Sequence, residues 1–99
     1  MNDDGFLDRK RDEIAAADRE IMVLLKKRLD ITTEIGAYKA EHGLDARNLA
    51  VEQKVVQRYR KLAEELGMDP DRTEIICRII MQESVAGEAE LIKRREIHE

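Results

Sequence analysis

Apolar side chains recur along the first forty residues with the spacing of a helix seam. They lie three or four residues apart, with one gap, at Ile14, Ala17, Ile21, Leu24, Ile31, Ile35 and Tyr38. This spacing is typical of helices that pair in coiled coils. No proline interrupts the stretch. The pattern predicts one long helix over about residues 6–42.

The gap in this seam is Arg28, a cation where the repeat favours an apolar side chain. Burying an unpaired guanidinium is costly, so Arg28 either bends out to water or meets an anion. Lys39 follows eleven residues later, three helical turns on, on the same face and about 16 Å away, with Thr32 and Ile35 between them. The two cations are therefore candidates for binding one small anion.

The length of this helix predicts a partner. A helix of about 35 residues spans roughly 50 Å, whereas a monomeric domain of this size has a radius of gyration of about 13 Å. A second copy of the chain is the simplest cover for the exposed seam. Arg11 lies about 25 Å along the helix from Arg28, so it can share a small ligand with Arg28 only from another copy.

Two more helices follow. Gly43 is a suitable stop for the first helix, and Asn48, with Asp45 as the alternative, is the expected N-cap of a helix over about 49–66.

Gly67 then ends this second helix. Asp69 and Pro70 provide a capping carboxylate and a first-turn proline, which predict a third helix over about 70–92. The expected fold is all-α, with residues 1–99 forming a single domain of three helices.

Polar residues interrupt the inner faces of the two later helices. The inner stripe of the second helix is expected to hold Glu52, Val55, Val56, Tyr59, Leu62, Ala63 and Leu66. That of the third holds Thr73, Ile76, Cys77, Ile80, Ser84, Gly87, Glu88 and Leu91. Glu52, Ser84 and Glu88 are thus candidates, with the two cations, for lining a pocket between helices. The alternative is a helical dimer whose seam ends are solvated.

The composition of the chain argues against several classes of partner and site. The net charge of −4 argues against a nucleic-acid partner, and no apolar stretch is long enough to span a membrane. The single cysteine, Cys77, allows no internal disulfide, and the polar N-terminus is unlike a signal peptide, so we expect a cytoplasmic protein. The histidines lack ligand spacing, so no metal site is expected.

Three motifs in order carry a resemblance to a known family. They are Arg11-x-x-Ile14-x-x-x-Asp18-x-x-Ile21 with Leu24-Leu25-x-x-Arg28 and Ile35-Gly36-x-x-Lys39, then Arg47-Asn48-x-x-x-Glu52, then Ile79-Ile80-x-x-Glu83-Ser84 followed by Glu88. Over about residues 7–91 the chain resembles the all-helical chorismate mutases. The resemblance implies an intertwined homodimer of three-helix subunits that rearranges chorismate to prephenate in aromatic amino acid biosynthesis, without cofactor or metal.

The resemblance also implies site residues. The catalytic ones are Arg11, Arg28, Lys39, Glu52 and Glu88, and the substrate-binding ones are Thr32, Ile35, Asn48 and Ser84. Arg28 and Arg11 of the other subunit would hold the two carboxylates of chorismate. Lys39 and Glu88 would donate hydrogen bonds to the ether oxygen.

Glu52 and position 48 would orient the ring hydroxyl, and Ser84 would contact a carboxylate.

The chain departs from the family pattern at three positions. Glu88 replaces the glutamine of some members and must be protonated to donate, so activity is expected to fall as pH rises. Asn48 replaces a frequent aspartate, and Val51 replaces an arginine that helps some members to hold substrate. Arg47 either compensates for that arginine or is a solvated loop charge.

Two rivals remain from sequence alone. An isochorismate–pyruvate lyase is similar to this family and has a similar cationic pocket. A catalytically silent dimerisation or regulatory module is the rival of another class, and the retained Arg11, Arg28, Lys39 and Glu52 argue against it.

Overall fold

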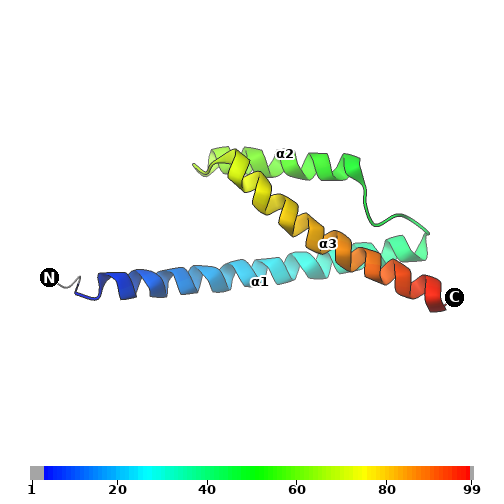
Figure 1. The fold of residues 1–99 in the computed structure, drawn as a ribbon, viewed down its shortest axis with the longest axis horizontal. Helices are drawn as coiled ribbons and strands as arrows, with labels where there is room; N and C mark the ends of the chain where they lie inside the picture. The colour runs from blue at the N-terminus through cyan, green and yellow to red at the C-terminus, as the bar shows by residue number, and fades with distance from the viewer. Residues whose placement is uncertain (1–3, 99) are drawn as a thin grey trace. The chain divides into compact units, whose positions relative to one another are not determined.

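Three helices make up the regular structure in a computed structural model that describes residues 4–98 (Figure 1). They are α1 (Phe6–Glu41), α2 (Leu49–Glu65) and α3 (Pro70–His98). The predicted all-α class and the long first helix are confirmed. The chain divides into two compact units, Met1–Ile31 and Thr32–Glu99, and α1 runs through the boundary.

The residues expected to end α1 and to begin α2 do so. Gly43 has φ +66°, the left-handed conformation that favours glycine after a helix. Asn48 is the N-cap of α2, and its side-chain oxygen accepts a hydrogen bond from Val51 N at 3.2 Å. This contact decides between the two predicted caps in favour of Asn48.

The third helix also starts where expected but ends later. Asp69 Oδ1 accepts a hydrogen bond from Arg72 N at 3.0 Å, with Pro70 in the first turn. The helix then continues to His98 instead of ending near residue 92. The reason is the absence of glycine and proline after Gly87 in a run of strong helix formers.

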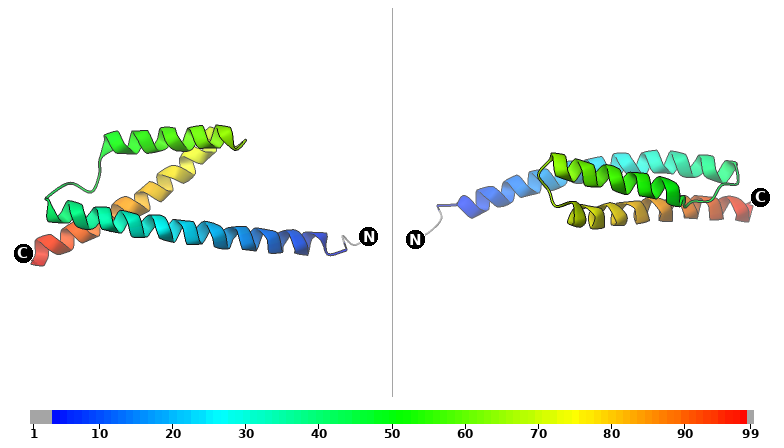
Figure 2. Two further views of the ribbon diagram at one scale, coloured as in Figure 1. Left: turned by 180° about the vertical axis from the view of Figure 1, so that it is seen from behind. Right: turned by 90° about the horizontal axis from the view of Figure 1, so that it is seen from above.

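The buried core of the unit formed by residues 32–99 lies between α2 and α3, which leave their shared turn at an angle (Figure 2). Its members are Val56, Ala63, Cys77 and Met81. Cys77 has no exposed surface and fills the core as a structural thiol.

Not every apolar residue predicted to face inward is covered. Leu62, Leu66 and Ile76 are 44%, 72% and 52% exposed. For these three residues the predicted inner stripes are wrong within one chain, because the stripes are wider than the contact that α2 and α3 make with each other.

A cluster of ion pairs joins α2 and α3 near the turn between them. Arg60 on α2 reaches Asp71 and Glu74 on α3, each at 2.9 Å. The Arg78 side chain, and after it Arg60, holds the pKa of Glu74 below its ordinary 4.5, while the bond to Asp71 raises the pKa of Arg60. Since folding lowers the pKa of Glu74, its stabilising contribution is present above pH 4.5 and is lost as the pH falls through the lower, folded value.

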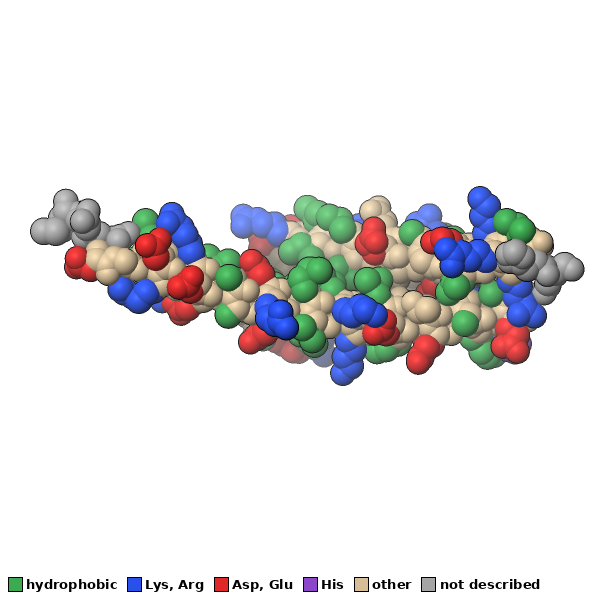
Figure 3. Space-filling model, turned by 90° about the horizontal axis from the view of Figure 1, so that it is seen from below, with side chains coloured by type: hydrophobic (Ala, Val, Ile, Leu, Met, Phe, Trp, Pro, Cys, Tyr) green, Lys and Arg blue, Asp and Glu red, His purple; other side chains and the backbone are tan. Residues whose placement is uncertain are grey.

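The unit that ends at Ile31 is one helical segment, and none of its described residues is buried. Large apolar side chains of the predicted seam are exposed on it, among them Ile14 at 58%, Ile21 at 54% and Leu24 at 63%. Hydrophobic side chains lie among charged ones on the surface in Figure 3. In the part of the chain that the structure describes, no helix is long and apolar enough to cross a lipid bilayer.

Candidate active site

A lysine and a glutamate that are far apart in the sequence meet in the second unit. Lys39 Nζ, from the last turn of α1, donates to Glu88 Oε2 at 2.8 Å and to the Ala46 carbonyl oxygen at 2.7 Å. The side chains of Lys39 and Glu88 are only 18% and 6% exposed. Both residues were predicted to act at the same substrate atom, and the structure brings them into contact.

Gly36 lets the two helices approach closely at this pair. A Cβ at position 36 would lie 3.1 Å from Glu88 Cα, from Glu88 Cγ and from Leu91 Cδ1, closer than ordinary contacts allow. Gly36 is also the buried residue of α1. The missing side chain therefore allows Glu88 to lie within reach of Lys39, one helical turn further along α1.

A second carboxylate, Glu52, stands in the first turn of α2. Arg47 Nε donates to Glu52 Oε2 at 3.0 Å, and Glu52 N donates to the Asn48 carbonyl oxygen at 3.0 Å. The side-chain oxygen of Asn48 is engaged as the cap of this helix. The local sequence Arg47-Asn48-x-x-x-Glu52 thus places a capping amide, a guanidinium and a carboxylate at one helix start.

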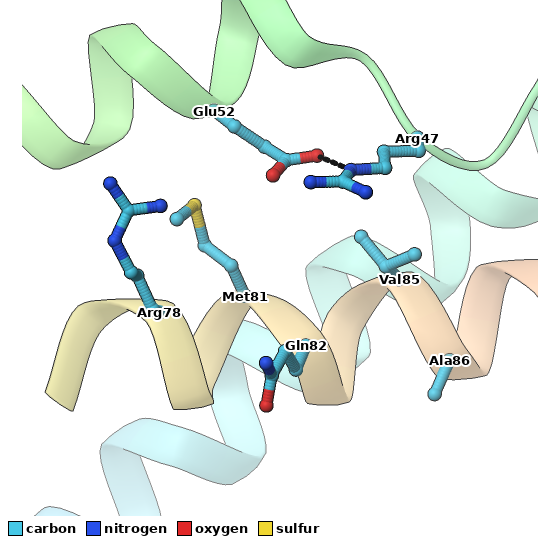
Figure 4. A pocket seen from close by; sticks show the side chains of 7 residues that line it. All are labelled: Arg47, Glu52, Arg78, Met81, Gln82, Val85 and Ala86. Atoms are coloured by element: carbon cyan, nitrogen blue, oxygen red, sulfur yellow. Dashed lines mark hydrogen bonds and ion pairs between the residues drawn. The ribbon is translucent and has the colours of Figure 1, made fainter. Parts of the chain in front are cut away.

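A pocket of about 330 Å³ opens beside Glu52, between the start of α2 and the middle of α3 (Figure 4). It is lined by Arg47, Glu52, Arg78, Met81, Gln82, Val85 and Ala86. Met81 and Val85 give it an apolar wall opposite the carboxylate. Neither residue was among the predicted site residues. They lie one turn apart on α3, with Val85 one turn and Met81 two turns before Glu88.

Ser84 also lies on this stretch of α3. It is buried, and its hydroxyl donates to the Ile80 carbonyl oxygen at 3.2 Å, one turn before Glu88. Thr32 and Ile35 belong to the α1 segment of the same unit, where Thr32 is half-buried and Ile35 is 44% exposed.

The other two predicted cations, Arg11 and Arg28, belong to the unit that ends at Ile31. Arg11 is exposed and pairs with Asp8 at 3.5 Å, while Arg28 is half-buried. Their predicted roles at the substrate stay predictions.

Chemically, the second unit offers a largely buried ammonium beside a carboxyl group, with a further carboxylate that lines a pocket. Fixed hydrogen-bonding groups of this kind orient small oxygen-rich ligands and stabilise charge that develops on them. Cys77, the one thiol of the chain, is buried in the core between α2 and α3.

Comparison with known proteins places this arrangement in a family. The family model of chorismate mutase type II matches residues 10–89. The T-proteins of Enterobacter agglomerans and Haemophilus influenzae are each 37% identical over 78 residues, covering 79% of this chain and 21% of each relative. The bifunctional chorismate mutase/prephenate dehydratase of Buchnera aphidicola is 29% identical over 84 residues, or 85% of this chain and 22% of that protein.

The chain thus spans about a fifth of the length of these curated relatives. The family match, by contrast, covers most of the chain, from the start of α1 into the second half of α3. It includes the motifs around Arg11, Lys39, Glu52 and Glu88 on which the resemblance was based. On this match the chain belongs to the chorismate mutase type II family.

Proposed function

We propose that this chain converts chorismate to prephenate, with Lys39 and Glu88 at the reacting ether oxygen. The family match bears out the predicted membership of the chorismate mutase family, and it supports the predicted activity, that of an isomerase in aromatic amino acid biosynthesis. The observation that carries the residue assignment is the contact of 2.8 Å between Lys39 Nζ and Glu88 Oε2, at a largely buried place.

The reaction makes limited demands on a protein. Chorismate rearranges in one concerted step, in which the ether C–O bond breaks as the new C–C bond forms, and neither a nucleophile nor a proton transfer is needed. Negative charge grows on the ether oxygen as the C–O bond breaks. The protein therefore acts by holding the reactive conformer and by donating hydrogen bonds to that oxygen.

In the proposed complex the ether oxygen lies between Lys39 and Glu88 and replaces the bond that joins them in the free chain. Lys39 donates from one side as an ammonium. Glu88 donates from the other side as a protonated carboxyl group, because an ionised carboxylate would repel the growing charge. Gly36 supports this geometry by letting α3 approach α1.

The remaining predicted residues hold the rest of the substrate. Arg28 and Arg11 of a second copy bind the two carboxylates, for which the planar guanidinium is well suited. Glu52 accepts a hydrogen bond from the ring hydroxyl beside the apolar wall of the pocket.

Asn48 supports Glu52 from the helix start, Ser84 contacts a carboxylate, and Thr32 and Ile35 flank the ligand on α1.

The partner in this proposal is a second copy of the chain, in the cytoplasm. The exposed apolar seam of α1 supports it, since burying each such side chain contributes about 1.5–3 kcal/mol. The homodimer also gives Arg11 a way to reach a site that its own chain does not complete. We expect an intertwined arrangement with two equivalent sites.

The test of this function is product analysis. Purified protein is incubated with chorismate and, separately, with isochorismate, and prephenate, pyruvate and salicylate are quantified. Prephenate from chorismate is the expected result. Release of pyruvate from isochorismate, with chorismate untouched, would favour the lyase, and no turnover of either by a folded dimer would favour the silent module.

Gly36→Ala is expected to lower kcat/KM for chorismate by about tenfold or more, because the new methyl group pushes Glu88 away from Lys39. The measurement is steady-state kinetics together with the midpoint of thermal unfolding.

Gly87→Ala is the matched control for this change. A Cβ at Gly87 meets nothing within 4 Å in the chain, and alanine is the better helix former by about 1 kcal/mol. Turnover should be unaffected by it. Equal rates for the two variants would contradict the role given to Gly36.

A further inference from the structure

We infer that Arg47 is a positioning residue, which holds the Glu52 carboxylate in the orientation that meets the substrate. The inference rests on the proposed function and adds a residue to it. Arg47 Nε donates to Glu52 Oε2 at 3.0 Å, and both residues line the pocket of about 330 Å³ (Figure 4). The two side chains differ in exposure, at 66% for Arg47 and 19% for Glu52.

An ion pair with one exposed partner contributes little to stability, typically under about 1 kcal/mol. The role of this ion pair in the proposal is to orient the Glu52 carboxylate. The bond engages one oxygen of the Glu52 carboxylate, and Figure 4 shows the Glu52 side chain extending toward Arg47. A carboxylate turned in this way presents a defined acceptor to a ligand hydroxyl.

Hydrogen bonds at the residues before and after Arg47 fix its backbone. The side chain can therefore keep a defined position although it is exposed. The preceding Ala46 carbonyl oxygen accepts from Lys39 Nζ at 2.7 Å. The following Asn48 caps α2 through Val51 N. The segment that carries Arg47 is therefore tied to the lysine of the site and to the helix that carries Glu52.

A second arginine, Arg78, lines the same pocket but bonds elsewhere. Its Nε and Nη2 donate to Glu74 Oε2 at 2.9 and 2.8 Å. Arg78 therefore brings positive charge to the pocket without orienting Glu52. The comparison of the two arginines separates positioning from a general electrostatic effect.

The test is a double-variant cycle in the chain of residues 1–99, with kcat and KM for chorismate as readouts. Arg47→Gln should lower kcat/KM by about tenfold, mainly through kcat, because a misoriented carboxylate still binds but holds fewer reactive conformers. In a Glu52→Gln background the same change should have almost no further effect. Arg78→Gln should instead change kcat/KM by the same factor in the wild-type background and in the Glu52→Gln background.

Arg94→Gln is the matched control for removing an exposed ion-paired arginine. Arg94 is also 66% exposed and pairs with Glu90 on its own helix, outside the pocket. It should leave kcat and KM unchanged.

An Arg47→Gln effect that persists in full beside Glu52→Gln would overturn the inference, since Arg47 would then act on the substrate itself. Unchanged kinetics of Arg47→Gln would overturn it too, while the proposed function stands. A wild-type chain that leaves chorismate unconverted would overturn the proposed function and this inference together.

Discussion

Replacing Lys39 with methionine is expected to lower kcat/KM for chorismate by about 10²–10³-fold. Removing one preorganised donor from a developing oxyanion has a cost of this size. Methionine keeps the length and apolar stem of the side chain, so the change removes mainly the ammonium. Steady-state kinetics with prephenate detection measures it.

The same change should also destabilise the fold at neutral pH, by up to about 3–5 kcal/mol, because Glu88 is left buried without its cation. A second variant separates the two effects. Lys39→Met combined with Glu88→Gln removes both charges and should restore most of the stability but none of the rate. A Lys39→Met chain that turns over chorismate normally would exclude Lys39 from the reacting oxygen.

The second large effect is recovery of activity in mixed dimers. Arg11→Ala and Lys39→Met are each expected to be nearly inactive alone. Mixed in equal amounts and refolded together, they should regain about a quarter of the wild-type rate, because half of the dimers are mixed and each of these has one intact site. The measurement is chorismate turnover after unfolding and refolding of the mixture.

Arg28→Ala with Lys39→Met is the control pair. Both residues are assigned to the same subunit's share of a site, so every site in their mixed dimers lacks one of them and no activity should return. Recovery in this control, or none in the first mixture, would contradict the assignment of Arg11 to the other subunit.

The sequence predicted the fold where local chemistry decides it. Gly43, Asn48 and the Asp69–Pro70 step mark helix ends through backbone conformation and capping bonds, which depend on few neighbours. The end of α3 was predicted too early, although the sequence beyond residue 92 contains no glycine or proline to end the helix.

Tertiary contacts were harder to predict. Helical periodicity identifies a face but not how much of it is covered, so Val56 and Ala63 are buried as expected while Leu62 and Leu66 are exposed. The interhelical angle, which decides this, depends on many contacts at once.

The candidate site likewise has residues that the sequence identified and residues that only the structure revealed. Lys39 and Glu88 were recognised as polar residues on apolar faces, and the structure joins them. Met81 and Val85 look like ordinary core residues in the sequence, and only the space beside Glu52 identifies them as pocket walls. Arg47 was left open between two roles, and the structure shows that it bonds to Glu52 across the start of α2.

The most direct test of the account is the pH dependence of prephenate formation from chorismate by wild type and by Glu88→Gln. Both proteins keep Lys39, so a difference between them reports on position 88. We predict that wild-type kcat/KM falls as pH rises, because a carboxyl group donates a hydrogen bond only in its protonated form, and that Glu88→Gln stays nearly constant over the same range, since an amide donates at every pH. A wild-type rate that holds to alkaline pH and matches that of Glu88→Gln would contradict the placement of Glu88 at the ether oxygen.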